Sequence, residues 1–193
     1  MTIKKAYILA GGRGTRLKSE TTNLPKPFLQ INEQPFIQYL INDLVAIGIQ
    51  HIVILAGYKG EILQAHYDGK RASSCLINVH SEAELLGTGG ALSKLANDEQ
   101  TSHMLVINGD SWLENGIKKV HASFKDEDLS NDESLMCLHK VQNEDRYGSV
   151  ETVGNFITRF NEKTHIEKGL MNSGLYFLAT AHLKKFSNQK SMS

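Results

Sequence analysis

The 193 residues fit one domain of ordinary size, and 21 basic and 21 acidic side chains leave no formal net charge. This balance excludes a bulk electrostatic attraction to nucleic acid or to an anionic membrane surface. The two cysteines, Cys75 and Cys137, form no C-x-x-C pair, which argues against a disulfide framework or a zinc site and predicts two buried, reduced thiols.

No segment of the sequence has the features of a membrane anchor. The apolar stretch Ala6–Ala10 is too short for a secretory signal, because a polar glycine loop follows it at once. No other apolar run approaches the length of a membrane-spanning helix. We therefore expect a soluble, cytoplasmic protein.

The first part of the chain alternates short apolar runs with segments of helical periodicity. Its predicted elements are, in chain order, a strand at Ala6–Leu9, a helix from Pro35 to Gly48, a strand at His51–Ala56, a helix at Lys59–Tyr67, a strand at Cys75–Val79, a helix at Gly89–Leu95 and a strand at Met104–Ile107. This alternation predicts a mainly parallel sheet with helices on both faces, connected by right-handed crossovers.

The pattern changes after about Lys125. The acidic stretch Asp126–Glu133 is expected to be a solvated surface loop, because consecutive carboxylates without apolar neighbours are usually exposed. Beyond it, Leu135–Val141, Ser149–Val153 and Leu170–Leu178 predict strands with short connections. These strands would add antiparallel pairs to the same sheet.

A glycine-rich loop follows the first predicted strand, within Leu9–Leu17, and Lys26 follows between two prolines. Glycines can adopt positive φ and turn successive N–H groups toward an anion, and Arg16 and Lys26 would supply positive charge. Because Pro25 and Pro27 stiffen the backbone, Lys26 would extend from a rigid base. The loop matches neither the P-loop nor the dinucleotide fingerprint, and a tight strand-to-helix turn is the alternative.

Asn108-Gly109-Asp110 stands at the end of the strand Met104–Ile107. Ligands of open α/β sheets collect beyond the carboxyl ends of the strands, so the glycine loop, Gly57 and this tripeptide would face one crevice. Asp110 is the best metal candidate, because Mg²⁺ typically uses one or two carboxylates together with substrate phosphates. The alternative is an aspartate that caps the next turn.

Five ordered motifs resemble the signature of the sugar-nucleotide pyrophosphorylases, or nucleotidyltransferases. They are the glycine loop with Pro25-Lys26-Pro27, Leu86–Ala91, Asn108–Asp110, Phe160–Lys163 and Asn172–Tyr176. The residues Leu86–Leu92 and Arg146–Glu151 are most similar to the branch that makes GDP-heptose from D-glycero-D-manno-heptose 1-phosphate. The resemblance implies a single domain with a Rossmann-like α/β fold of the nucleotide-diphospho-sugar transferase type, in which residues 1–124 bind the nucleotide and residues 134–193 bind the sugar phosphate.

The resemblance also implies a reaction and its residues. An oxygen of the sugar 1-phosphate would attack the α-phosphorus of GTP and release pyrophosphate, with Mg²⁺ as cofactor, to supply a nucleotide sugar for surface polysaccharide such as lipopolysaccharide. Lys26 would contact the α-phosphate, Arg16 the departing phosphates and Lys163 the sugar phosphate. The other implied residues are Leu9, Gly11, Gly12, Gly14, Thr15, Gly87 and Asn108 for the nucleotide, Gly148, Glu162 and Asn172 for the sugar, and Asp110 for the metal.

Several alternatives stay open. The substrate could be mannose 1-phosphate or a uridine nucleotide, or the chain could bind such ligands without turnover. From the residues alone, Glu162 and Lys163 could be an exposed charged pair after a strand, with Phe160-Asn161 as a turn, and Thr88 could cap a helix. The family continues after Asn172–Tyr176 to a D-I-G-T-P segment with a second acidic metal ligand. That segment is not among the 193 residues, so we expect an incomplete metal site or a substitute ligand.

Overall fold

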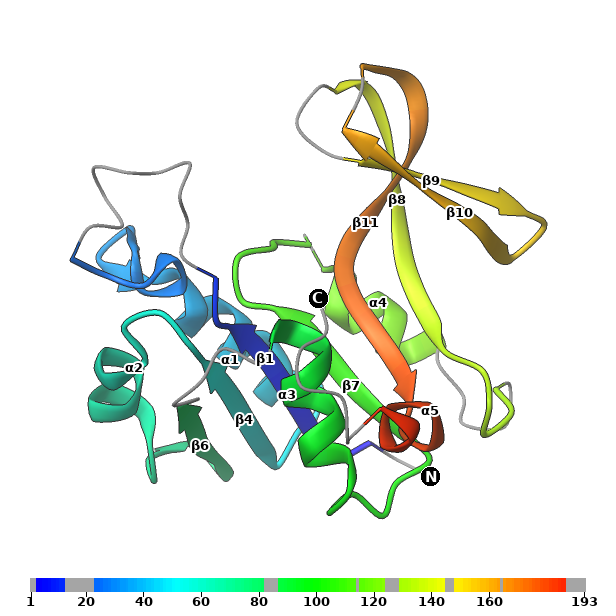
Figure 1. The fold of residues 1–193 in the computed structure, drawn as a ribbon. Helices are drawn as coiled ribbons and strands as arrows, with labels where there is room; N and C mark the ends of the chain where they lie inside the picture. Colours follow the sequence, from blue (N-terminus) through cyan, green and yellow to red (C-terminus); the bar gives the residue numbers. More distant parts are fainter. Residues whose placement is uncertain are drawn as a thin grey trace.

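In a computed structural model of the chain, the described residues are 3–12, 23–81, 87–113, 115–123, 129–144, 148–163 and 165–186 (Figure 1). The helical elements are η2 (Lys26–Phe28), α1 (Phe36–Ala46), α2 (Gly60–Tyr67), α3 (Gly87–Ala96), α4 (Gly116–Ser123) and α5 (Thr180–Lys185). The strands are β1 (Lys5–Ala10), β2 (Gln30–Ile31), β3 (Gln34–Pro35), β4 (His51–Ala56), β5 (Arg71–Ala72), β6 (Cys75–Ser81), β7 (His103–Asn108), β8 (Leu135–Glu144), β9 (Gly148–Val153), β10 (Phe156–Lys163) and β11 (Ile166–Ala179).

The described residues form a nine-stranded mixed sheet in the order β10-β9-β11-β7-β1-β4-β6-β5, with β8 paired to β11. The central strands β7, β1, β4 and β6 are parallel, and Ile8 of β1 lies in register with both Ile54 and Ile107. The other strands of this sheet join antiparallel, through β11 on one side and β5 on the other, whereas β2 and β3 pair only with each other. The structure thus confirms an α/β fold whose central parallel part is extended by antiparallel strands.

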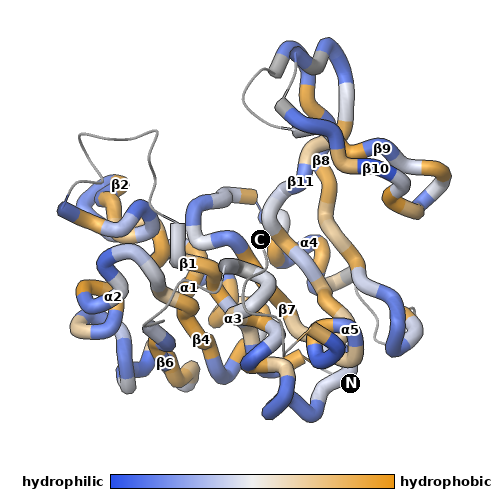
Figure 2. Tube along the Cα trace, viewed as in Figure 1, coloured by the Kyte–Doolittle hydropathy of each residue, from blue (hydrophilic) through white to orange (hydrophobic). Residues whose placement is uncertain are grey.

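The central strands separate two apolar cores, because alternate side chains point to opposite faces of a sheet. In β1, Ile8 packs in the core that includes α1, whereas Tyr7 packs in the core that includes α3. Figure 2 shows apolar residues concentrated along β1, β4 and β7. Burial on both faces explains why these strands read as continuous apolar runs in the sequence.

Helix α1 shows how the sequence determines one of these faces. Its residues Ile37, Leu40, Ile41 and Leu44 are all at most 1% exposed, as their helical spacing predicts. Gly48, whose φ is +88°, reverses the chain after the helix. Positive φ favours glycine, and this explains the end of the predicted helix.

Strand β10 is absent from the strands predicted from the sequence. Phe160 and Asn161 belong to this strand, so the alternative that they form a turn is wrong. Phe160 pairs with Val150, and the Asn161 amide donates to Ser149 Oγ at 3.1 Å. The β9–β10 hairpin projects from the parallel strands, and Phe160 is 60% exposed (Figure 1). Solvent on both sides removes the apolar alternation by which a strand is recognised.

Two other sequence predictions are refined. Cys75 and Cys137 are free thiols, but Cys137 is only half-buried. Of the acidic stretch 126–133, residues 129–133 form no helix or strand and are largely exposed, in agreement with a surface loop, and residues 126–128 lie outside the described part. None of the helices in the described ranges is both long enough and apolar enough to cross a membrane.

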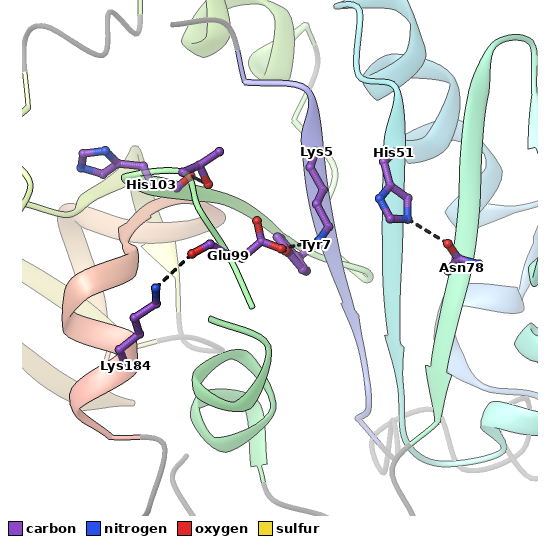
Figure 3. Close-up of polar contacts among 8 residues, drawn as sticks. Lys5, Tyr7, His51, Asn78, Glu99, His103 and Lys184 are labelled. Atoms are coloured by element: carbon purple, nitrogen blue, oxygen red, sulfur yellow. Dashed lines mark hydrogen bonds and ion pairs between the residues drawn. The ribbon is translucent and has the colours of Figure 1, made fainter. Parts of the chain in front are cut away.

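The amino-terminal edge of the parallel strands is fastened by Glu99, which follows α3 and is 9% exposed (Figure 3). Its carboxylate accepts hydrogen bonds from Lys5 Nζ and from Tyr7 Oη, both on β1. Its backbone carbonyl accepts a hydrogen bond of 3.0 Å from Lys184 Nζ on α5. Burial, followed by the hydrogen bond to Glu99, raises the pKa of Tyr7. One residue therefore joins the first strand, the segment after α3 and the last helix.

Candidate functional site

Two residues that the sequence assigns to phosphate and metal form an ion pair. Lys26 Nζ lies 2.7 Å from Asp110 Oδ2. The two side chains are 35% and 41% exposed, so both are open to a ligand in solvent. Lys26 comes from η2 and Asp110 from the turn after β7, which puts both at the carboxyl edge of the parallel strands. This is the opposite edge from Glu99.

The local sequence around Lys26 explains its rigid position. Pro25 precedes η2 with extended backbone angles, and Pro27 is buried. The turn is closed by the Phe28 N–H, which donates to the Pro25 carbonyl at 2.8 Å. The proline rings fix φ on both sides of Lys26, in agreement with the rigid base expected from the sequence.

Gly109 carries Asp110 against the end of β1. Its N–H donates to the Leu9 carbonyl at 2.8 Å, and a Cβ at this position would lie 2.8 Å from that same oxygen. Only glycine fits this approach, because real Cβ atoms do not come so close to an oxygen. The predicted residues Leu9 and Asp110 are thereby joined through backbone, and Asn108 completes the end of β7 beside them.

A second close approach supports the glycine loop. The Tyr58 N–H donates to the Gly11 carbonyl at 3.3 Å, and a Cβ at Gly57 would lie 2.8 Å from the Gly11 Cα. Gly12 has open space around it. Gly11 at the start of the glycine loop, Gly57 and the turn after β7 therefore meet at one edge, as the sequence predicts. Gly57 also positions Gly11, which the sequence pattern did not indicate.

The turn that carries Asp110 also touches β11. Pairing of β11 with β8 shifts register between Asn172 and Tyr176, and Gly174 within this bulge has a φ of +78°. A Cβ at Gly174 would lie 2.7 Å from Ser111 Oγ and 2.8 Å from Asn108 Nδ2. The bulge therefore abuts the residues on both sides of Asp110.

Asn172 holds this bulge in shape. Its side-chain oxygen accepts the Gly174 N–H at 2.8 Å, and its amide nitrogen donates to Tyr176 Oη at the same distance. Ser173 Oγ donates to the Cys137 carbonyl at 2.6 Å. The predicted sugar residue Asn172 thus has an internal structural role in addition to any contact with ligand.

The remaining predicted sugar residues lie on the projecting hairpin. Gly148 begins β9 and pairs with Lys163 of β10, and a Cβ on Gly148 would collide with the Asn161 carbonyl. Glu162 is exposed on β10. The structure places this group on a different part of the sheet from Lys26 and Asp110. The side chain of Lys163 lies outside the described part of the molecule.

Arg16, Gly14 and Thr15 lie outside the described residues. Gly87 begins α3 with a φ of +73°, a conformation that suits glycine. Thr88 is therefore within the first turn of α3 rather than before it.

A divalent metal at this edge would find the carboxylate of Asp110. Within the described ranges, no three His, Cys, Asp or Glu side chains gather in a way that could hold a metal ion. Mg²⁺ is usually held by one or two carboxylates, and substrate phosphates and water complete its shell. The described residues therefore fit a Mg²⁺ ion that would be held by Asp110 and would complete its coordination shell with phosphate oxygens.

An aromatic cluster beside Asp110 was not anticipated from the sequence. Trp112, the only tryptophan, is 49% exposed, and its ring meets Phe36 at 6.3 Å and Tyr39 at 6.0 Å between centroids, both edge-on. Phe36 and Tyr39 belong to α1, so the cluster fastens the segment after Asp110 to that helix. The contact joins residues more than 70 positions apart, and no local pattern reports it.

Comparison with known proteins gives consistent matches. The model of the nucleotidyl transferase family matches residues 5–192. D-glycero-alpha-D-manno-heptose 1-phosphate guanylyltransferase of Aneurinibacillus thermoaerophilus is 35% identical, over 89% of this chain and 73% of that protein. Mannose-1-phosphate guanyltransferase of Neurospora crassa is 34% identical, over 89% of this chain and 48% of that protein. The crystal structure of HddC from Yersinia pseudotuberculosis complexed with GMP-PN has a TM-score of 0.83 at 30% identity, over 99% of this chain and 83% of that one.

Proposed function

Since the chain belongs to the nucleotidyl transferase family, we propose that it transfers a guanylyl group from GTP to D-glycero-α-D-manno-heptose 1-phosphate. The similarity to a named heptose guanylyltransferase and to HddC complexed with GMP-PN supports the nucleotide and the sugar. The observation that carries the proposal is the Lys26–Asp110 pair at the carboxyl edge of the sheet, because it sets a cation beside a carboxylate where a nucleotide would bind.

The reaction makes modest demands on the protein. An oxygen of the sugar 1-phosphate forms a bond to the α-phosphorus of GTP, and the bond from that phosphorus to the bridging oxygen breaks. The electron pair leaves with pyrophosphate. The attacking phosphate is already ionised near neutral pH, with a second pKa of about 6, so no protein nucleophile is needed. The protein must align two polyanions and neutralise negative charge.

Each site residue has a role within this proposal. The Lys26 ammonium group, which contacts Asp110, would also contact the α-phosphate of the nucleotide. Its stiff backbone would keep the positive charge in place. Arg16 would contact the departing phosphates, and Lys163 the sugar phosphate. Asp110 would hold Mg²⁺, which when bound would neutralise charge on the phosphate oxygens. The backbone of Gly11 and Gly87 would approach the nucleotide closely.

The proposed division of labour follows the two parts of the sheet. Residues 1–124, with the parallel strands, would bind the nucleotide, and residues 134–193, with β8 to β11, would bind the sugar phosphate. Gly148, Glu162 and Asn172 would line the sugar side. The support is topological: β11 pairs with β7 near its end and with β9 before the bulge, while β8 pairs along both portions, so β11 runs from one part to the other.

The test is a substrate panel. Purified protein with Mg²⁺ is incubated with each of GTP, ATP, UTP and CTP against heptose, mannose and glucose 1-phosphates, while pyrophosphate release is followed. We expect the highest kcat/KM with GTP and the heptose phosphate, and GDP-heptose in the mass spectrum. No pyrophosphate with any pair, together with calorimetric binding of GTP, would replace the proposal with a non-catalytic binding module.

One second substrate is favoured by a specific observation. The Neurospora crassa relative is named for mannose 1-phosphate and is 34% identical to this chain. A higher kcat/KM for mannose 1-phosphate than for the heptose phosphate would select this sugar while leaving the guanylyl transfer in place.

A further inference from the structure

The bulge in β11 is a built feature rather than an accidental irregularity. Asn172 and Ser173 each make a side-chain hydrogen bond within it, the first to the Gly174 N–H and the second to the Cys137 carbonyl of β8. Gly174 itself sits at a φ of +78°, in the left-handed region. A β-bulge changes the direction of a strand locally, and glycine adopts the positive φ that this bulge contains without strain.

The bulge packs against the turn that carries Asp110. Any Cβ on Gly174 would enter the space of Ser111 Oγ at 2.7 Å and of Asn108 Nδ2 at 2.8 Å. The turn is closed by the Ser111 N–H, which donates to the Asn108 carbonyl at 3.3 Å. Asp110 lies inside this closed turn, so any displacement of Asn108 or Ser111 moves its carboxylate relative to Lys26.

We propose that Gly174 is a positioning residue for Asp110: its lack of a side chain lets the β11 bulge support the Asn108–Ser111 turn and hold the carboxylate opposite Lys26. The proposal rests on the guanylyl transfer proposed above. It assigns to Gly174 a role that neither the sequence motif nor the family membership gives it.

The same contact connects the two parts of the molecule. Before the bulge β11 pairs with β9, and after it β11 pairs with β7, which leads into the turn of Asp110; β8 pairs with β11 on both sides of the bulge. Gly174 is therefore where the strand proposed to serve the sugar phosphate touches the turn proposed to serve the metal. A change of position in one is transmitted to the other through close packing.

The chain offers a matched control for the test. Gly154, in the turn between β9 and β10, has a φ of +59° but nothing within 4 Å of its Cβ position. An alanine at Gly154 or at Gly174 is placed in the left-handed region, whereas only Gly174→Ala adds the collision with Ser111 and Asn108. The difference between the two variants isolates the contact from the backbone strain.

Wild type, Gly174→Ala and Gly154→Ala are compared by pyrophosphate release at rising Mg²⁺, by thermal unfolding and by Trp112 emission without ligand. We expect Gly174→Ala to need about 10–100-fold more Mg²⁺ for half-maximal rate, as for loss of an outer-shell support of a metal ligand. We also expect its Trp112 emission to shift, because Trp112 is two residues from Asp110. Gly154→Ala should lose only stability.

Each outcome decides something. Equal Mg²⁺ dependence and equal emission in the two variants, with equal loss of stability, would overturn the positioning role. Ser111→Gly added to Gly174→Ala removes the collision at 2.7 Å but leaves the one with Asn108, so it should bring the Mg²⁺ requirement part of the way back to that of the wild type. This double variant also provides the test if Gly174→Ala does not fold, since it should then be recovered folded. A wild type that releases no pyrophosphate would overturn the proposed function instead, and the emission comparison would still decide the role of Gly174.

Discussion

Lys26 is oriented by its neighbours before any ligand arrives. Its ammonium group meets Asp110 at 2.7 Å, yet both side chains are more than a third exposed. Exposed ion pairs contribute only about 0–1 kcal/mol to stability, because solvent screens them. We therefore expect the pair to serve the proposed reaction rather than the stability of the fold.

Replacement of Lys26 tests whether this side chain serves turnover rather than stability. We expect Lys26→Ala to lower kcat by roughly 10²–10³, the cost of removing a preorganised charge-stabilising group. Steady-state pyrophosphate release measures the rate and thermal unfolding measures the stability, which should change little. Lys70→Ala, at an exposed lysine after α2, is the matched control. A near-normal kcat in Lys26→Ala would remove Lys26 from the mechanism.

Cys137 lies on β8, next to the β11 bulge, and its reactivity depends on burial. Burial raises the pKa of this thiol to about 11. The backbone carbonyl of Cys137 also accepts the hydroxyl of Ser173 at 2.6 Å, which ties the residue to the β11 bulge. Because the thiolate is the reactive species, a raised pKa makes the folded thiol slow to react.

Thiol labelling checks this strand pair. At pH 8, Cys137 should carry about a hundredfold less thiolate than an ordinary cysteine with a pKa near 9, and burial also raises the pKa of Cys75. Labelling with Ellman's reagent should therefore be slow in native protein, faster as pH rises toward 11, and complete for both thiols in denaturant. Rapid labelling of Cys137 at pH 8 would mean that β8 separates readily from β11.

Elements differ in how readily the sequence predicts them. Strand β4 coincides with its predicted range, His51–Ala56, because burial on both faces leaves an unbroken apolar run. Helix α1 follows its apolar spacing in the same way. Strand β10 was not predicted because it lies in a hairpin that projects into solvent. Its apolar residues Phe156 and Phe160 are exposed, so the strand has no alternation of buried and exposed positions. Local hydrophobic periodicity indicates which face of an element is buried. It therefore gives no signal for a strand whose two faces are both exposed.

The candidate site was predicted to a similar extent. The motif resemblance predicted that Lys26 and Asp110 lie in one site, and the ion pair between them agrees with that expectation. The supporting contacts of Gly57, Gly174 and Trp112 were not foreseen, since each joins segments distant in sequence through van der Waals packing. No residue pattern along the chain encodes such contacts. The roles of Lys26, Asp110, Arg16 and Lys163 stay predictions.

The two edges of the parallel strands have different tasks in the molecule as a whole. The carboxyl edge carries the Lys26–Asp110 pair, whereas the amino edge is fastened by Glu99, which joins β1 to α5. Burial and the Glu99 hydrogen bond both raise the pKa of Tyr7. Stability from this phenol is therefore fully present below pH 10, its ordinary pKa, and decreases as pH rises above it.

Removal of Glu99 should affect folding but not turnover. We expect Glu99→Ala to lower the free energy of unfolding by about 1–3 kcal/mol, because Tyr7 Oη loses its buried acceptor. Urea unfolding at pH 7.5 measures this, and the loss of stability above pH 10 should become shallower in the variant. Glu61→Ala, at an exposed position on α2, is the control. Unchanged stability in Glu99→Ala would show that the amino edge needs no fastening.

The alternation of β1 between two cores limits how this chain can change in length. Tyr7 and Ile8 are neighbours, yet they belong to opposite faces. Inserting or deleting one residue in this strand would move the side chains beyond that position to the opposite face, and no single substitution could repair the error. Evolution can therefore vary the side chains of β1 conservatively, while additions and losses of residues must accumulate in the surface connections.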